Sequence, residues 1–274
     1  MADVADDNAA VGRRPGVIAS DLDGTLFGPD HELSDRTIDA LRAARQSGWM
    51  VVAATGRAPR SAMERLARHD VVDGLVCSNG SIIHDVSTDA PLRRYTIDPD
   101  HLGSLFTALD AAVPELSFCW EMLHTSAWDH GFDDIAREHD DLRTFGVGPR
   151  PDAAIAVTKV MVRHPDVIRH QLAEWLLPHL PAPLTLGCSG VDFVEITGVG
   201  VDKSQALSHV IDEAGFRAED VVAFGDNHND VQMLRWAGHG VAVANGVDAA
   251  KHAADEVTGH HRDNSVAAYI ESLL

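Results

Sequence analysis

Residues 16–27 read GVIASDLDGTLF. The apolar run over residues 17–19 predicts a buried strand, and Asp21 and Asp23 follow it, just before Gly24. Aspartate is unfavourable inside a strand, and an isolated buried charge is costly. We therefore expect the two carboxylates at an exposed strand end, or beside groups that compensate their charge.

Apolar runs and helical patterns alternate towards both ends of the chain. Residues 33–48 predict a helix that has Ser34 as its N-cap and ends at Gly48. We expect further strands at 49–55, 74–80, 221–226 and 240–246, and further helices at 58–69, 204–215 and 229–238. Short, doubly apolar strands that alternate with helices predict an α/β fold whose core is a Rossmann-like parallel sheet, covered on both faces.

The middle of the chain has a different character. Its turns are richer in proline, and strands are expected at 158–164 and 191–197, with a helix at 165–180 between them. We predict an inserted α+β cap domain at 94–190 and a core made of residues 15–93 and 191–274. Residues 1–14 are expected to be a disordered lead-in.

Composition limits the partners of the protein. The net charge of −20 and the pI near 5.0 argue against nucleic acids and anionic membranes. No apolar run reaches the length of a membrane helix, and the N-terminus does not have the pattern of a secretory signal. Three widely spaced cysteines favour a reducing, cytoplasmic location over a disulfide framework. An anionic substrate would therefore need a metal ion or a few placed cations to attract it.

Polar side chains end four of the predicted strands, at the edge where open parallel sheets bind ligands. Carboxylates from separate strand ends repel one another without a cation, and hard oxygen ligands suit Mg²⁺. A lysine and helix N-termini suit a phosphate group. The candidate residues are Asp21, Asp23, Thr55, Gly56, Asn79, Lys203, Asp226, Asn229 and Asp230.

The motifs DLDGTLF, ATGR, VDKSQAL and FGDNHND, in this order, resemble the four motifs of the haloacid dehalogenase superfamily. The segments CSNGS and VAVANG, and the position of the insert between the second and third motifs, are similar to its Cof-like sugar-phosphatase branch. The resemblance covers nearly all of the chain except the lead-in. The third motif has KSQAL where the family commonly has a glycine after the lysine.

That resemblance implies a Mg²⁺-dependent phosphatase that hydrolyses phosphomonoesters of small metabolites, with sugar phosphates favoured, through an aspartyl-phosphate. Asp21 would be the nucleophile, and Asp23 would protonate the leaving oxygen and then act as a base on water. Mg²⁺ would be held by the Asp21 carboxylate, the Asp23 backbone carbonyl and Asp226. The phosphoryl group would be bound by Thr55, Gly56, Lys203 and Asn229, and the site would be supported by Asp230 and Asn79.

Several of these residues also admit structural interpretations. Asp21 and Asp23 match part of a calcium-binding loop, but a strand precedes them and the ligand pattern is incomplete. Thr55 could cap the next helix, Arg57 could be a salt-bridge partner or a substrate contact, and Asn79 could be a turn former.

Other functions also remain open from the sequence. A phosphosugar mutase would pass the phosphoryl group to a second sugar position, and a non-catalytic phosphometabolite-binding protein could use the same fold. In the insert, the aromatic stretch at 117–132 could line a sugar pocket with Trp120, Glu121, His124, Trp128 and His130. Alternatively, its tryptophans could form the insert's own core and its histidines could lie at the surface. The expected partner is a small phosphorylated metabolite, and the oligomeric state is left open.

Overall fold

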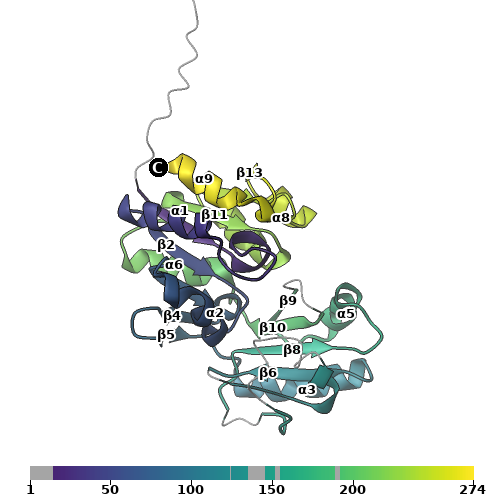
Figure 1. Ribbon diagram of the computed structural model, residues 1–274. Coiled ribbons are helices and arrows are strands. Elements are labelled where there is room, and N and C mark those ends of the chain that lie inside the picture. The colour runs from purple at the N-terminus through teal and green to yellow at the C-terminus, as the bar shows by residue number, and fades with distance from the viewer. Residues whose placement is uncertain (1–14, 124, 135–145, 152–154, 189–191) are drawn as a thin grey trace, which may run out of the picture.

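The computed structural model describes residues 15–123, 125–134, 146–151, 155–188 and 192–274. Within them the chain forms two sheets, each with its own helices, and the smaller sheet lies below the larger one in Figure 1. The expected disordered lead-in, residues 1–14, falls outside the described residues. Among the described helices, none has the length and apolar character that a membrane span requires.

The larger sheet confirms the predicted α/β core. Strands β13, β12, β11, β1, β2 and β3 run parallel in this order, and β4 and β5 continue the sheet in antiparallel fashion. The strand that precedes Asp21 is therefore central. The bounds are β1 (Val17–Ser20), β2 (Met50–Ala54), β3 (Gly74–Cys77), β4 (Ile82–Asp85), β5 (Ala90–Arg94), β11 (Val221–Gly225), β12 (His239–Ala242) and β13 (Glu256–Val257).

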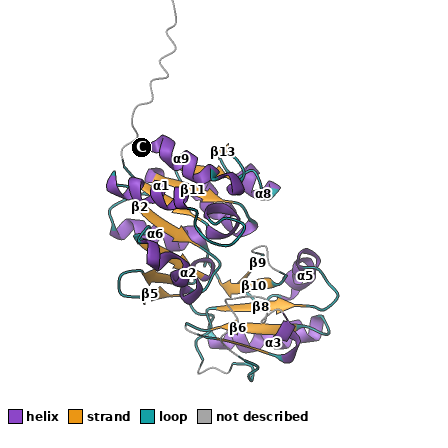
Figure 2. Ribbon diagram, in the orientation of Figure 1, coloured by secondary structure: helices purple, strands orange, loops and turns teal. Residues whose placement is uncertain are grey.

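Helices cover both faces of this sheet, as Figure 2 shows. Successive side chains of β1 point to opposite faces, so Ile18 packs with α1, α2 and α9, while Val17 and Ala19 pack with α6, α7 and α8. Burial on both faces explains why the strands are apolar throughout. The helix bounds are α1 (Asp35–Gln46), α2 (Pro59–Leu66), α6 (Lys203–Glu213), α7 (Val231–Trp236), α8 (Asp248–Ala253) and α9 (Ser265–Leu273).

Helix α1 confirms its sequence prediction in detail. The Ser34 side chain accepts a hydrogen bond from the Thr37 backbone N–H at 3.1 Å, as an N-cap does. Gly48, just beyond the helix, has a φ of +91°, a conformation that glycine adopts without strain. The helix expected at 165–180 is shorter than predicted, because α5 covers only Arg169–Leu176. Pro178 lacks the backbone N–H that would continue the α-helical pattern.

The smaller sheet is antiparallel, with strand order β7, β6, β8, β10 and β9, and α3 and α5 pack on one face. Its last strand in sequence, β10, continues to Gly198. A boundary at residue 190 would divide this sheet, so we propose that the insert ends after Gly198. The bounds are α3 (Pro99–Ala112), β6 (Ser117–Glu121), β7 (Ser126–Trp128), β8 (Lys159–Arg163), β9 (Leu184–Gly187) and β10 (Val194–Gly198).

The two faces of the smaller sheet differ in polarity. Phe118 and Trp120 of β6 and Val160 of β8 belong to the apolar cluster with the helices. Because side chains alternate along a strand, Glu121 and Lys159 lie on the face opposite α3 and α5. Trp128 is buried in a second small cluster, so both tryptophans of the aromatic stretch are core residues rather than pocket walls.

Gly80 allows the turn after β3 to touch the start of α6. Its φ is +102°, and a Cβ there would lie 2.2 Å from the Asp202 carbonyl oxygen. We expect Gly80→Ala to lower the free energy of unfolding by about 2 kcal/mol or more, through strain and displacement of α6. Urea denaturation would measure the change.

Gly103→Ala is the matched control. Gly103 is exposed in α3, and a Cβ there would meet nothing within 4 Å. The better helix propensity of alanine should raise the free energy of unfolding by about 0.5–1 kcal/mol. Equal effects of the two substitutions would contradict the proposed role of Gly80.

Candidate active site

A buried lysine organises the end of β1. Lys203 Nζ donates hydrogen bonds to Asp21 Oδ1 and Asp230 Oδ1, both at 2.6 Å, and Lys203 itself is 0% exposed. Burial opposes the charged ammonium, but the two carboxylates outweigh that effect and raise the pKa of Lys203. Asp202 holds Lys203 at the first position of α6, since its side chain accepts from the Gln205 backbone N–H at 3.0 Å.

Asp230 is fully committed to protein partners. Its Oδ1 accepts from Lys203, and its Oδ2 accepts from the backbone N–H groups of Asp226 and Asn227, each at 2.9 Å. Gly225 makes this approach possible, because a Cβ at that position would lie 2.5 Å from the Asp230 Cβ. The geometry therefore makes Asp230 a brace for Lys203 and for the loop that carries Asp226.

Asp226 faces Asp21 across the turn that follows β1. Its Oδ1 accepts from the Thr25 hydroxyl at 3.0 Å. Gly24, with a φ of +78°, lets the carboxylate come close, because a Cβ there would lie 2.5 Å from Asp226 Oδ2. Asn245 holds the same turn by donating its side-chain amide to the Gly24 carbonyl at 2.8 Å.

The carboxylates of Asp21, Asp226 and Asp230 fit a divalent cation. One oxygen from each lies within 4.8 Å of the others. Burial, followed by the charge of Asp230, raises the pKa of Asp226 to about 6, and burial also raises the pKa of Asp21 well above its usual range. Three carboxylates share this site with one ammonium, and their oxygens are hard donors of the kind that Mg²⁺ prefers. Because Asp230 is already engaged, Asp21 and Asp226 are the carboxylates available to a cation.

Asp23 points into a different environment from Asp21. Arg57 donates to both of its oxygens, Nε to Oδ2 and Nη2 to Oδ1, each at 2.6 Å, and His31 Nδ1 lies 2.9 Å from Oδ1. Burial raises the pKa of Asp23, but the hydrogen bonds from Arg57 and His31 outweigh it and leave the pKa lowered. Of the two interpretations of Arg57, the structure contains the salt bridge.

Thr55 and Gly56 form the turn after β2. Thr55 does not cap α2, since the N-cap position belongs to Ala58, which makes no side-chain cap. Instead its Oγ1 accepts from the Arg57 backbone N–H at 3.1 Å, which leaves the hydroxyl hydrogen free to donate to a ligand. A Cβ on Gly56 would lie 3.0 Å from Asn79 Oδ1, so this glycine lets the Asn79 amide approach.

Asn79 is both a turn residue and part of the site. Its φ of +57° is left-handed. Its Oδ1 accepts from Asn229 Nδ2 at 2.9 Å, and its Nδ2 donates to Glu195 Oε2 at 3.0 Å. Asn229 Oδ1 is buried and has no hydrogen-bond partner in the structure. A phosphate oxygen offers no hydrogen to that atom, so Asn229 suits a water or hydroxyl donor.

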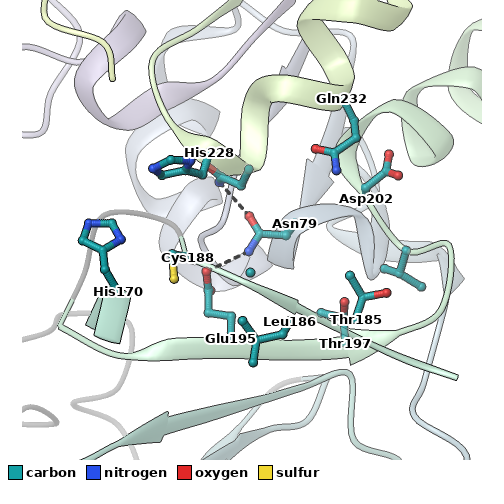
Figure 3. Close-up of a pocket in the computed structure, with 13 residues that line it drawn as sticks. Asn79, His170, Thr185, Leu186, Cys188, Glu195, Thr197, Asp202, His228 and Gln232 are labelled. Atoms are coloured by element: carbon teal, nitrogen blue, oxygen red, sulfur yellow. Dashed lines mark hydrogen bonds between the residues drawn. The ribbon is translucent and has the colours of Figure 1, made fainter. Parts of the chain in front are cut away.

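A cavity of about 290 Å³ opens beside these two asparagines, between the two sheets. In Figure 3, Asn79 and Glu195 meet at its wall, and His170 and His228 lie on the same side. Their imidazole rings are 5.8 Å apart. The cavity is therefore built from both the strand-end loops of the larger sheet and the face of the smaller sheet.

Sequence reasoning missed Lys159 and Glu195 of the insert, and it named Glu121 only as part of a possible sugar pocket. Glu121, Lys159 and Glu195 are each less than 5% exposed, and they reach the strand-end loops of the larger sheet. The available signal was a charged residue beside apolar ones within two predicted strands, at 158–164 and 191–197. His124, from the same aromatic stretch, lies outside the described residues.

Comparison with known proteins identifies relatives of this fold and site. Residues 18–270 match the family model of the haloacid dehalogenase-like hydrolases. The pyridoxal phosphate phosphatase of Escherichia coli strain K12 is 31% identical over 278 residues, which cover 94% of this chain and 98% of that protein. The 5-amino-6-(5-phospho-D-ribitylamino)uracil phosphatase of Bacillus subtilis strain 168 is 29% identical over 254 residues, covering 93% and 94% of the two chains.

A solved structure shares the whole fold. A phosphatase of the haloalkanoate dehalogenase superfamily from Bacteroides thetaiotaomicron superposes with a TM-score of 0.82 over 97% of each chain, at 21% sequence identity. At that identity the likeness concerns the fold alone.

The carboxylate cluster predicts that Mg²⁺ stabilises the protein. A cation that binds the folded cluster and not the unfolded chain adds about 2.7 kcal/mol at about 100 times its Kd. Calorimetry in EDTA and then in excess Mg²⁺ should show a rise in Tm. Asp226→Asn should remove most of that rise, whereas Asp263→Asn, at an exposed turn residue, should keep it. An equal rise in both variants would contradict this site.

Proposed function

Since the chain belongs to the haloacid dehalogenase-like hydrolases, in their Cof-like branch, and is a phosphatase, we propose that it hydrolyses small phosphorylated metabolites with Mg²⁺, through an aspartyl-phosphate. The observation that carries this proposal is the Asp21 carboxylate, which Lys203 fixes at the end of the central strand with Asp226 beside it. A buried carboxylate with a fixed direction is prepared to act as a nucleophile.

The first half of the reaction transfers the phosphoryl group to the protein. A carboxylate oxygen of Asp21 attacks phosphorus, the bond from phosphorus to the ester oxygen breaks, and the leaving oxygen takes a proton from Asp23. In the second half, Asp23 takes a proton from water, which attacks the same phosphorus. The bond from phosphorus to the Asp21 oxygen breaks and phosphate leaves. The Asp21 carboxylate and the protonated Asp23 are then restored.

The contacts of Asp23 suit its role as the base in the second half of the reaction. Its ion pair with Arg57 keeps it a carboxylate, which is the form that accepts a proton from water. To act as the acid in the first half, Asp23 must carry a proton. We therefore infer that substrate entry loosens its contacts with Arg57 and His31. His31 is the more accessible partner to displace, since its side chain is 62% exposed against 13% for Arg57.

The remaining residues bind the group that is transferred. Thr55 donates its free hydroxyl hydrogen, and Lys203 offers its ammonium to the developing charge. Mg²⁺ would be held by the carboxylates of Asp21 and Asp226 and the backbone carbonyl of Asp23, where it would neutralise charge on the phosphoryl oxygens. The buried Oδ1 of Asn229 would orient a water molecule.

The substrate class is proposed more broadly than a single compound. Sugar phosphates remain favoured from the sequence resemblance, and the named substrates of the two relatives also carry a phosphate on a small organic molecule. The cavity between the sheets, of about 290 Å³, would hold the organic part of such a substrate. The three buried free cysteines support the proposal of a reducing, cytoplasmic location.

Asp21→Asn should abolish turnover and leave the fold intact, because an amide of nearly the same shape is a poor nucleophile. With p-nitrophenyl phosphate and Mg²⁺, we expect kcat to fall by about 1,000-fold or more, or about 4 kcal/mol of barrier. Asp35→Asn, in the exposed first turn of α1, is the control and should keep full activity. Turnover of Asp21→Asn within about tenfold of the wild type would refute the nucleophile assignment.

Asp23→Asn should separate the two halves of the reaction. An activated aryl leaving group needs no proton, so phosphoenzyme formation from p-nitrophenyl phosphate should survive better than formation from an alkyl phosphate. Breakdown of the phosphoenzyme should be slow with either substrate, because the base is missing. Quenched-flow measurement of the phosphoenzyme would test this, and an equal loss for both substrates in the first step would exclude Asp23 as the acid.

A further inference from the structure

Three buried charges lie on the face of the smaller sheet opposite α3 and α5. Glu121 and Lys159 are paired residues on neighbouring strands, and their side-chain charges are 3.6 Å apart. Lys159 Nζ donates to Glu195 Oε1 at 2.9 Å. All three residues are 3–4% exposed. Buried ions of this kind are costly unless each is well paired.

Each charge has partners within the smaller domain and one partner in the loops that follow strands of the larger sheet. Glu121 accepts from the Thr158 hydroxyl at 3.1 Å and also from the Ser78 hydroxyl. Lys159 donates to Glu195 and to the Gly56 carbonyl, the latter at 3.0 Å.

Glu195 follows the same pattern, since it accepts from Lys159 and, at 3.0 Å, from Asn79. The three charges are thus satisfied only when the two sheets are held as in this structure.

The partners of these charges on the side of the larger sheet are connected to the candidate phosphate site. Gly56 is the residue after Thr55, and Asn79 is hydrogen-bonded to Asn229. The backbone N–H of Asn79 also donates to the Thr55 carbonyl at 3.0 Å. The three charges therefore contact the turn that carries Thr55, the candidate phosphate ligand, and they reach Asn229 through Asn79.

The chemistry of Glu195 fixes the direction of both amides. A carboxylate only accepts hydrogen bonds, so Asn79 must present its NH₂ group to Glu195 and its oxygen to Asn229. Asn229 must then donate its NH₂ group, which leaves its own oxygen unpartnered and buried beside the cavity. Lys159 supplies the opposite charge to Glu195, through the 2.9 Å hydrogen bond from its ammonium.

We propose that the Lys159–Glu195 ion pair of the insert is a positioning device for the phosphate site: it holds the Gly56 carbonyl and sets the amide directions of Asn79 and Asn229. This inference rests on the proposed function for its kinetic consequence, although the positions themselves are measurable without activity. Neither residue of the pair touches the reacting atoms, since both oxygens of Glu195 are engaged by protein groups.

Glu195→Gln is the sharpest test. Glutamine has nearly the same shape, but it can donate as well as accept, so the amides of Asn79 and Asn229 are free to reverse. With p-nitrophenyl phosphate and saturating Mg²⁺, we expect kcat to fall about tenfold or more, while KM changes by less than about threefold and Tm by only a few degrees. Lys159→Met should lower kcat similarly. Glu174→Gln, an exposed glutamate of α5, is the matched control and should behave as the wild type.

Hydrogen–deuterium exchange gives a second, activity-independent readout. In Glu195→Gln, exchange should become faster in peptides that cover residues 55–57 and 78–81, because the Ser78 N–H bonds the Arg57 carbonyl and the Asn79 N–H bonds the Thr55 carbonyl. Peptides from α3 should be unchanged. A merely structural role would accelerate exchange throughout the smaller sheet instead.

The outcomes separate this inference from the proposed function. An inactive wild-type protein would refute the proposed function, and the exchange pattern would still decide the inference. In an active wild type, a kcat of Glu195→Gln within about twofold of normal would overturn the positioning role. A change confined to KM for larger substrates would also overturn it, because Glu195 would then be a substrate contact. If Lys159→Met does not fold, Glu195→Gln decides alone.

Discussion

The buried ammonium of Lys203 is the interaction on which the rest of the site depends. It binds Asp21 from the central strand and Asp230 from the loop after β11, so it joins two neighbouring strand ends through one cation. Asp226 lies beside these two carboxylates, so three carboxylates and one ammonium together carry two negative charges. A divalent cation would balance that charge, so we propose that Lys203 and a metal ion together offset the cost of burying Asp21.

Much of this arrangement could be predicted from the sequence, because parallel strands bring their carboxyl ends to one edge. Knowing that Asp21, Thr55, Asn79 and Asp226 each follow an apolar strand was enough to expect them together. In the structure Asp21 and Asp226 belong to one carboxylate cluster, and the Asn79 backbone N–H donates to the Thr55 carbonyl. Helix α1 could be predicted equally well, because its N-cap and the glycine after its end are local signals in the sequence. Kinetic measurements on the Asp21 and Asp23 variants test whether these residues perform the proposed chemistry.

The insert was harder to read because its contacts are not local. The charge of Lys159 sits at the start of an apolar strand, and a sequence gives no direct sign that it reaches Gly56, 103 residues away. The alternation of β10 predicted a strand correctly, but its sheet depends on pairing with β8 and β9, which periodicity does not specify. The hydrogen-bond direction of Asn79 likewise follows from its neighbour Glu195 and not from its own motif.

The polar nature of the junction between the two sheets has a functional consequence. An apolar junction of the same size would gain free energy from water exclusion and would resist opening, which would bar a substrate from the cavity. Buried ion pairs contribute little net stability, because desolvation offsets their attraction, yet they are demanding in geometry. Glu121, Lys159 and Glu195 would be rehydrated by a separation of the two sheets, and each has its full set of protein partners only in the arrangement of this structure. Such a junction specifies the closed geometry without making it permanent, which is what a site that must admit a metabolite and then hold its phosphate in place requires.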